Sequence, residues 1–297
     1  MTRGTACGAV MLAVVCALHG ASAQQKVQLG HATSATVSLR LVAAVGELKV
    51  VGWDRDSVDL SGVVPAGSRV EMHAGSPFEK ATGMKMYMEP PTEATGREGR
   101  LILRVPRAAR VWLKTGSADM DVAGVTGGLD LNVVGGSITV HGNPKELRAE
   151  SMDGAVIVDG APEWMRAKTA TGDISLKGGQ DVAASTISGA IRVTGGEVDH
   201  AKFESTTGAI SLTSTVARGA SIEIESHSGA IDIELPFKSS TDLDIATITG
   251  TIDNQWSRGR PVAGHEGRGM TFTSSGGMTG GRIVVRTFKG TVTLKPR

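Results

Sequence analysis

A glycine-centred pattern of apolar and polar positions recurs along most of the chain. Inward apolar or small residues stand seven, five and three places before each glycine, and two and four places after it. The repeat around Gly172 fills these positions with Met165, Ala167, Thr169, Ile174 and Leu176. Alternation with a period of two predicts a β-strand on each side of the glycine, and the glycine itself marks a bend without room for a side chain.

The repeats have a regular spacing. The glycines of the frame are Gly136, Gly154, Gly172, Gly189, Gly208, Gly229 and Gly250, with Gly290 in the same frame. From Gly136 to Gly250 they are 18, 18, 17, 19, 21 and 21 residues apart. This spacing is typical of one turn of a β-solenoid and too short for helix pairs or propeller blades. The sequence predicts an all-β, single-domain parallel β-solenoid (β-helix), with coils of about 17–21 residues and end caps.

Three places before the glycine the residue is nearly always Ser or Thr. Val133 interrupts a column whose hydroxyl-bearing members are Ser151, Thr169, Thr186, Ser205, Ser226, Thr247 and Thr287. Coils stacked about 4.8 Å apart would place these hydroxyls in an inward ladder, each donating to the next. A nucleophilic role for one of the serines is disfavoured, because a row of equivalent hydroxyls offers no distinct base.

The two ends of the chain follow the frame less closely. Residues 64–100, rich in Gly, Pro, Met and charge, predict a hairpin or loop over one open end of the solenoid. Residues 264–286 predict a hairpin around residues 276–281 that closes the other end against edge-to-edge association. We therefore expect N-terminal strands and a cap over residues 24–115, and a regular solenoid with a C-terminal hairpin cap over residues 116–297.

Residues 1–23 have the features of a secretory signal peptide. A basic start and a short apolar run precede an A-x-A cleavage site at residues 21–23, so the mature chain would begin near Gln24. The apolar run is shorter than the roughly 20 residues of a membrane span. We expect an exported protein, periplasmic or at the cell surface, without a transmembrane span. Both cysteines, Cys7 and Cys16, lie in the signal, which leaves the mature chain without a thiol.

The charge of the mature chain argues against one class of partner. The full sequence has 31 basic and 30 acidic residues, and Arg3 is the one charged residue of the signal, so the mature chain is nearly neutral. Bulk electrostatic binding to nucleic acid requires a basic surface. We expect no nucleic-acid partner.

Three sequence features carry a resemblance to a known family. They are Gly52-Trp53-Asp54-Arg55 after a strand, Arg104-Val105-Pro106, and the serial Ser/Thr-Gly-x-Ile turns. With them the mature chain resembles, over nearly its whole length, the DUF4097 family of "putative adhesins", which implies a β-solenoid of the bacterial envelope. Many members have Asp after the repeat glycine, a position that here holds Asp173 but also Ala155, Ala190, Ala209 and Ala230. A regular outward row of carboxylates is therefore not implied.

No catalytic, cofactor-binding or metal-binding residue is predicted. The six histidines after residue 23 share no strand or register, and no nucleophile elbow, P-loop or calcium repeat is present. The acidic residues of 223–253 could bind a cation, but we favour a solvated surface partnered by the basic residues of 258–297. The basic run from Arg97 to Lys114 could touch an anionic glycan, but we favour an ordinary charged surface at a strand edge.

Trp256, Arg258 and Arg260 are the candidate partner-binding residues. They lie in an irregular stretch where an indole and two guanidiniums could meet a sugar or an anion. The alternative is that Trp256 covers the last coil. Trp112 is expected in a strand and Trp164 in a turn between coils, and neither is assigned a binding role.

These features favour a non-enzymatic envelope or surface protein, an adhesin, scaffold or recognition rod that binds a protein or glycan of the envelope or cell surface. One alternative is a polysaccharide-active β-helix enzyme, which needs a groove, long loops and a base, whereas coils of 17–21 residues leave little loop length. Another is a regulator or sensor of envelope stress, for which the sequence shows no partner domain. No cofactor is expected.

Overall fold

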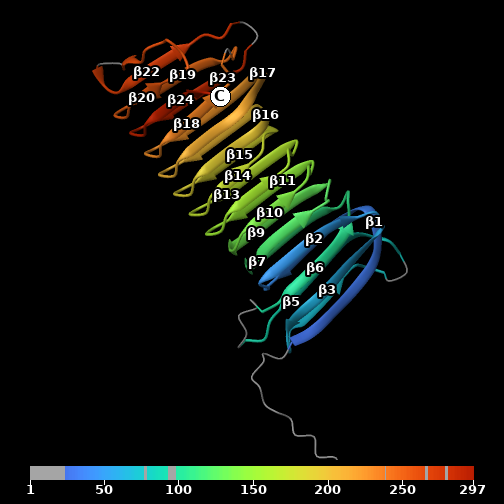
Figure 1. The fold of residues 1–297 in the computed structure, drawn as a ribbon. Coiled ribbons are helices and arrows are strands. Elements are labelled where there is room, and N and C mark those ends of the chain that lie inside the picture. Colours follow the sequence, from blue (N-terminus) through green and yellow to red (C-terminus); the bar gives the residue numbers. More distant parts are fainter. Residues whose placement is uncertain (1–23, 77–78, 93–97, 238, 265–266, 278–279) are drawn as a thin grey trace, which may run out of the picture.

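The computed structural model describes residues 24–76, 79–92, 98–237, 239–264, 267–277 and 280–297. Every element assigned in these ranges is a β-strand, and 24 strands join in one mixed sheet. Figure 1 shows the strands stacked along an elongated body, from β3 and β5 at one end to β20 and β22 at the other. Over the same ranges, no helix has the length and apolar character needed to cross a membrane. The predicted signal, residues 1–23, lies outside the described residues.

The strands form two rows that face each other across the core. In spatial order, the first row contains β4 (Arg69–His73), β5 (Ala81–Glu89), β1 (Gln24–Ala43), β7 (Arg110–Ser117), β9 (Gly128–Gly135), β11 (Glu146–Ser151), β13 (Trp164–Thr169), β15 (Gly179–Thr186), β16 (Ile191–Ser205), β17 (Ile210–Ser226), β23 (Arg282–Thr287), β19 (Asp242–Thr247), β22 (Met270–Ser274) and β21 (Val262–Ala263). The second row contains β3 (Ser57–Pro65), β6 (Arg100–Pro106), β2 (Glu47–Trp53), β8 (Asp119–Ala123), β10 (Ile138–His141), β12 (Val156–Asp159), β14 (Ile174–Leu176), the first parts of β16 and β17, β18 (Ile231–Leu235), β24 (Val292–Pro296) and β20 (Ile252–Asn254).

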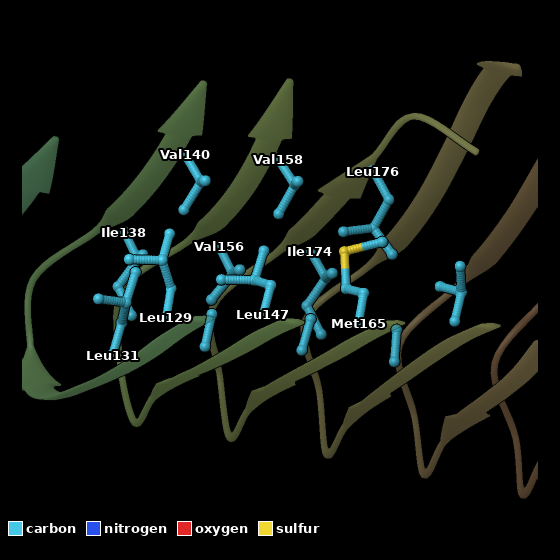
Figure 2. Close-up of a cluster of buried hydrophobic side chains, with 14 of the residues drawn as sticks. Leu129, Leu131, Ile138, Val140, Leu147, Val156, Val158, Met165, Ile174 and Leu176 are labelled. Atoms are coloured by element: carbon cyan, nitrogen blue, oxygen red, sulfur yellow. The ribbon is translucent and has the colours of Figure 1, made fainter. Parts of the chain in front are cut away.

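The frame positions predicted to be inward form the core between the rows. Parallel neighbours are one repeat apart, so that Ile138 pairs with Val156 and Val156 with Ile174. Figure 2 shows these side chains facing those of the first row across the interior, with the labelled members Leu129, Leu131, Leu147 and Met165. All of them are at most 3% exposed. Because every repeat places apolar groups at the same positions, one continuous core runs along the stack.

The spatial order of the strands departs from their chain order at both ends of the stack. β1 and β2 lie between β5 and β6 on one side and β7 and β8 on the other. β23 and β24 lie between β17 and β18 on one side and the earlier strands β19 and β20 on the other. Each of these two intercalated strand pairs therefore has hydrogen-bonding partners on both sides.

Antiparallel strands lie at both ends of the stack. β4 pairs with β5, and β3 pairs with β6 and with the first part of β1. At the other end β22 runs antiparallel to β19 and to β21. The structure differs here from the hairpin predicted for residues 264–286, because β23 pairs with β17 and β19 and not with β22. Residues 265–266 and 278–279 of that predicted hairpin lie outside the described residues.

The Ser and Thr column faces inward as predicted, but it does not form a continuous ladder. The Gly229 N–H donates to Ser226 Oγ at 2.9 Å, and the Gly290 N–H donates to Thr287 Oγ1 at 3.0 Å. Thr169 Oγ1 also lies 3.0 Å from Thr186 Oγ1, a link between layers. Most of these hydroxyls bond within their own bend, because the N–H three residues later is closer than the hydroxyl of the next layer.

Candidate functional site

Two tryptophans face outward from strands that lie three layers apart in the first row. Trp112 lies in β7 and Trp164 begins β13, with β9 and β11 between them. The residues beside them, Val111, Leu113 and Met165, are buried, so both indoles have the outward parity of their strands. Trp164 is 36% exposed and Trp112 is half-buried. Trp164 therefore lies in a strand and not in the predicted turn.

A hollow of about 340 Å³ is lined by both indoles. Gly128 forms part of its lining and stands in the same column as Glu146 and Trp164, one and two layers away. A Cβ on Gly128 would meet Arg110 Cγ at 3.5 Å and Glu146 Oε2 at 3.8 Å, which are ordinary contact distances. The backbone therefore does not require a glycine here, and Gly128 is buried against the Arg110 and Glu146 side chains.

The charged side chains around this hollow are held in pairs. Arg110 Nη2 lies 3.3 and 3.4 Å from the two carboxylate oxygens of Glu146, a contact that spans the layer containing Gly128. Arg148 donates to Glu150 at 2.7 and 3.0 Å, and this hydrogen bonding raises the pKa of the Arg148 guanidinium. The hollow thus has fixed hydrogen-bond donors and acceptors with nearly balanced charge.

Two further guanidiniums lie against the indoles. Arg40 Cζ is 3.9 Å from the ring centre of Trp112, and Arg166 Cζ is 4.5 Å from that of Trp164. Arg40 stands directly opposite Trp112 on the neighbouring strand β1. Cation–π contacts of this kind contribute about 0.5–1 kcal/mol at exposed sites, so they favour one orientation of each ring.

The second surface feature is an apolar ridge along the bends of the first row, one place after the Ser and Thr column. In spatial order the apolar ridge comprises Val134, Met152, Ala170, Ile187, Thr206, His227, Phe288 and Ile248. Its large apolar members Val134, Met152, Ile187, Phe288 and Ile248 are 50, 56, 58, 43 and 53% exposed. The His227 ring is stacked on Phe288, with ring centres 5.0 Å apart. Hollows of about 350 and 460 Å³ follow the ridge and share Lys168, Thr169 and Ile187.

The structure separates the three residues predicted to bind a partner. Trp256 is 9% exposed and its indole N–H donates to the Pro236 carbonyl oxygen at 3.2 Å, so the ring belongs to the core. Arg258 and Arg260 are exposed, and within the described residues their side chains have no hydrogen bond or ion pair. A partner could therefore reach the two guanidiniums but not the indole. Partner binding by Trp256, Arg258 and Arg260 stays a prediction.

Basic side chains contact the acidic stretch of residues 223–253, as the favoured interpretation expects. Arg286 donates to Asp244 at 2.9 Å, which lowers the pKa of that carboxyl, because β23 lies beside β19. Lys202 lies 2.9 Å from Glu204 and within 4 Å of two carboxylates of this stretch, and the Glu204 hydrogen bond is the largest cause of its raised pKa. In the described part of the chain, no three His, Asp or Glu side chains gather as a metal-binding group. Lys238 lies outside the described residues.

Much of the basic run that precedes the regular repeats is also paired with carboxylates. The pairs are Arg100 with Glu47 at 3.3 Å, Arg104 with Asp59 at 2.9 Å and Arg107 with Asp54 at 2.7 Å. This arrangement matches an ordinary charged surface. Arg97 lies outside the described residues.

Neither the hollow nor the apolar ridge is among the features predicted from the sequence, although the sequence contains a signal for each. Residues 128, 146 and 164 are spaced by 18, the local repeat length, so Gly128 and Trp164 belong to one outward column. The ridge is likewise a single column of the frame. Reading the outward positions of each repeat as columns would have identified both features.

Comparisons with known proteins give structural neighbours of low similarity. No family model matches the sequence, and no curated protein matches it. Among solved structures, the chain is similar to a "putative adhesin" from Parabacteroides distasonis (12% identity, TM-score 0.46, 93% of this chain and 98% of the other). It is also similar to a "putative adhesin" from Bacteroides fragilis (10%, 0.42, 92% and 98%) and to a "putative lipid binding protein" from P. distasonis (13%, 0.43, 91% and 96%). At these identities and TM-scores, the names say nothing about what this chain binds.

Proposed function

We propose that the chain folds as a parallel β-solenoid and acts as a non-enzymatic recognition rod, an adhesin or scaffold of the cell envelope or surface. Eleven layers of the described residues, with one strand in each row, support this fold: β5/β6, β1/β2, β7/β8, β9/β10, β11/β12, β13/β14, β15/β16, β16/β17, β17/β18, β23/β24 and β19/β20. Paired residues in the regular part are one repeat apart, as Val156 and Ile174 (174 − 156 = 18) or Ile210 and Ile231 (231 − 210 = 21). At about 4.8 Å per layer the stack is roughly 50 Å long.

The apolar ridge is the observation that carries the binding function. Five of the eight ridge positions carry large exposed apolar side chains, as the neighbouring pairs Val134/Met152 and Phe288/Ile248 and as Ile187 between them. Exposed apolar groups gathered on one face mark surfaces that another molecule covers. Covering the five large ridge side chains would remove on the order of 300 Å² of apolar surface from water, worth roughly 7 kcal/mol before the cost of association. This area is below the roughly 800 Å² that each partner contributes to a standard protein interface. A partner would therefore also contact the charged residues beside the ridge.

The charges beside the ridge indicate the chemistry of that partner. Lys114 and Lys168 line the hollow next to the ridge, and within the described residues neither side chain has a hydrogen bond or ion pair. Glu150, which lies between them in the same column, is paired with Arg148. This arrangement fits a protein that presents an apolar strip flanked by carboxylates, and we propose such a protein as the partner.

A binding experiment with matched variants tests the ridge. Labelled mature protein is added to intact and to permeabilised cells of its source, and the bound fraction is measured for the wild type, for Met152→Ser/Ile187→Ser and for Ile157→Ser. Ile157 is 41% exposed but lies in β12 of the second row, so it controls for loss of exposed apolar area. We expect at least tenfold weaker binding for the ridge variant, no change for Ile157→Ser, and loss of binding after the cells are treated with protease. Equal binding of all three proteins would refute the proposal.

Two further points belong to the same proposal. Residues 1–23 would direct export, and protease treatment of a tagged chain in intact and permeabilised cells distinguishes the surface from the periplasm. Digestion in intact cells would favour adhesion, and protection until permeabilisation would favour a periplasmic scaffold.

Arg258 and Arg260 are proposed as an additional contact for an anionic group on the partner. The resemblance to the DUF4097 family is compatible with this function.

A further inference from the structure

We infer that the hollow between Trp112 and Trp164 binds an uncharged saccharide of one or two rings. The hollow is on the outward face of the first row, near the beginnings of β9, β11 and β13, whereas the apolar ridge follows the ends of these strands. The two sites share no lining residue. The inference therefore does not depend on the protein partner proposed for the ridge.

The size of the hollow suits a small polar molecule. Its volume of about 340 Å³ lies near the lower end of the roughly 300–1,000 Å³ range of small-molecule sites. The two indoles supply flat apolar surface, and the hollow's lining on the two strands between them includes the charged side chains of Asp130, Glu146 and Arg148. A ligand that fills the hollow meets apolar and polar surface at once.

A sugar ring matches this combination of surfaces. One face of a pyranose presents C–H groups that pack on an indole, and its edge carries hydroxyls that both donate and accept hydrogen bonds. The lining offers carboxylate acceptors on Glu146 and Asp130 and guanidinium donors on Arg110 and Arg148. An apolar ligand of the same size would cover these charged groups without replacing their hydrogen bonds to water, which costs free energy.

The charge balance favours an uncharged sugar over an acidic one. Arg110 is paired with Glu146, and Arg148 is paired with Glu150. Asp130 accepts a hydrogen bond from the Asn132 side chain, a neutral group. A carboxylate on the ligand would therefore meet two carboxylates and no unpaired guanidinium in the lining.

The site is formed before the ligand arrives. The guanidiniums of Arg40 and Arg166 hold the two rings, and the strands that carry the rings are hydrogen-bonded through β9 and β11. Side chains already fixed in the free protein lose little conformational entropy on binding. The distance between the two indoles is therefore a property of the stack and sets the size of ligand that fits.

Titration of the mature protein tests the inference. Intrinsic tryptophan fluorescence and calorimetry are followed during addition of a panel of neutral mono- and disaccharides that includes cellobiose and N,N′-diacetylchitobiose, with digalacturonate as the acidic probe. We expect saturable binding of at least one neutral sugar with a Kd on the order of 1 mM, and at least tenfold weaker binding of digalacturonate. No saturation by any neutral sugar of the panel, or tighter binding of digalacturonate, would overturn the inference.

Variants then locate the binding site. Trp164→Ala removes one indole and Gly128→Leu fills the hollow, and each is expected to weaken sugar binding at least tenfold, whereas Trp164→Phe keeps an aromatic face and is expected to stay within about threefold of the wild type. Met152→Ser/Ile187→Ser should bind the sugar like the wild type, whatever it does to cell binding. If thermal unfolding shows that Gly128→Leu folds poorly, Trp164→Ala decides. Unchanged sugar affinity of Trp164→Ala would show that the hollow is not the site.

Discussion

The repeat glycines lie directly against the backbone of the neighbouring layer. A Cβ on Gly208 would lie 1.7 Å from the carbonyl oxygen of Gly189, and one on Gly154 would lie 1.8 Å from that of Gly136. Such distances cannot be relieved by a rotamer change, because the contacted atom is backbone. The glycine column is therefore required by the close stacking of bend upon bend.

This contact predicts a large difference between two glycine substitutions. Gly208→Ala would push two layers apart and is expected to lower the free energy of unfolding by about 3 kcal/mol. Gly116→Ala is the matched control, since a Cβ there meets nothing within 4 Å. It should raise the free energy of unfolding by about 0.5 kcal/mol, because alanine lowers the conformational entropy of the unfolded chain. Urea unfolding followed by circular dichroism measures both. Equal effects of the two changes would contradict the stacking argument.

The Ser and Thr column contains bonded and unbonded hydroxyls in equivalent places. Ser226 Oγ accepts the Gly229 N–H, whereas Ser205 Oγ is buried without a partner in the described part of the chain. Ser226→Ala leaves a buried N–H unsatisfied and should cost about 1–3 kcal/mol of stability. Ser205→Ala removes an unpaired polar group and should be neutral or stabilising. Thermal and urea unfolding compare the two variants, and a larger loss for Ser205→Ala would refute the assignment.

At the scale of elements, the intercalated strands β23 and β24 fill a position in the interior of the stack. Their inward side chains Ile283, Val285, Val292 and Leu294 are fully buried between layers that precede them in the chain. Burial of four such side chains stabilises by roughly 6–12 kcal/mol. That is comparable to the whole stability of many domains, so this strand pair holds the adjoining layers in place.

Deletion of residues 282–297 is therefore expected to unfold the last layers of the stack. Without β23 and β24, the strands β17 and β19 lose a shared neighbour, and limited proteolysis should cleave within residues 231–281. A synthetic peptide of residues 282–297 should restore protection by strand addition. A deletion variant that melts like the full chain and ignores the peptide would contradict this role.

The sequence predicts the elements of this fold better than their order. Alternation around each glycine predicts where strands lie and which side chains are inward, because strand geometry fixes both. The same regularity leaves the order undetermined, since any repeat offers the same apolar face and the same bend to any other. The Gly290 repeat, 40 residues after Gly250 in the chain, enters the stack beside Gly229. That Trp112 and Trp164 line one hollow can be predicted only once the order of the layers is known.

Across the whole molecule, aspartates tie neighbouring layers together. In the described part of the chain, five have a pKa below the usual value because they accept hydrogen bonds from another layer: Asp54 from Arg107, Asp119 from the Ser137 backbone and hydroxyl, Asp159 from Lys177, Asp173 from Arg192 and Asp244 from Arg286. These groups are largely exposed, so each contributes little by itself. Their number makes the stack sensitive to acid as a whole.

Stability should therefore fall as the pH decreases below about 4. Since each carboxyl has a lower pKa in the folded chain, the unfolded chain binds more protons there, and protonation favours unfolding. The stabilisation is fully present above the unfolded pKa of about 3.9 and is lost as the pH falls through the folded values. Urea unfolding at pH 7, 5 and 3 measures this dependence, and Asp119→Asn should make it shallower. A stability that rises between pH 5 and pH 3 would refute the expectation.

The position of β23 and β24 in the stack also fixes an order of events during synthesis. β19 and β20 leave the ribosome before β23 and β24. In the folded stack, however, β19 and β20 lie on the far side of β23 and β24 from β17 and β18. Until β23 and β24 have emerged, the layer of β17 and β18 has no native neighbour on that side. This part of the molecule cannot grow by adding each strand as it appears. If the chain crosses a membrane unfolded, an interrupted molecule would keep an open strand edge, which proteases can recognise and remove.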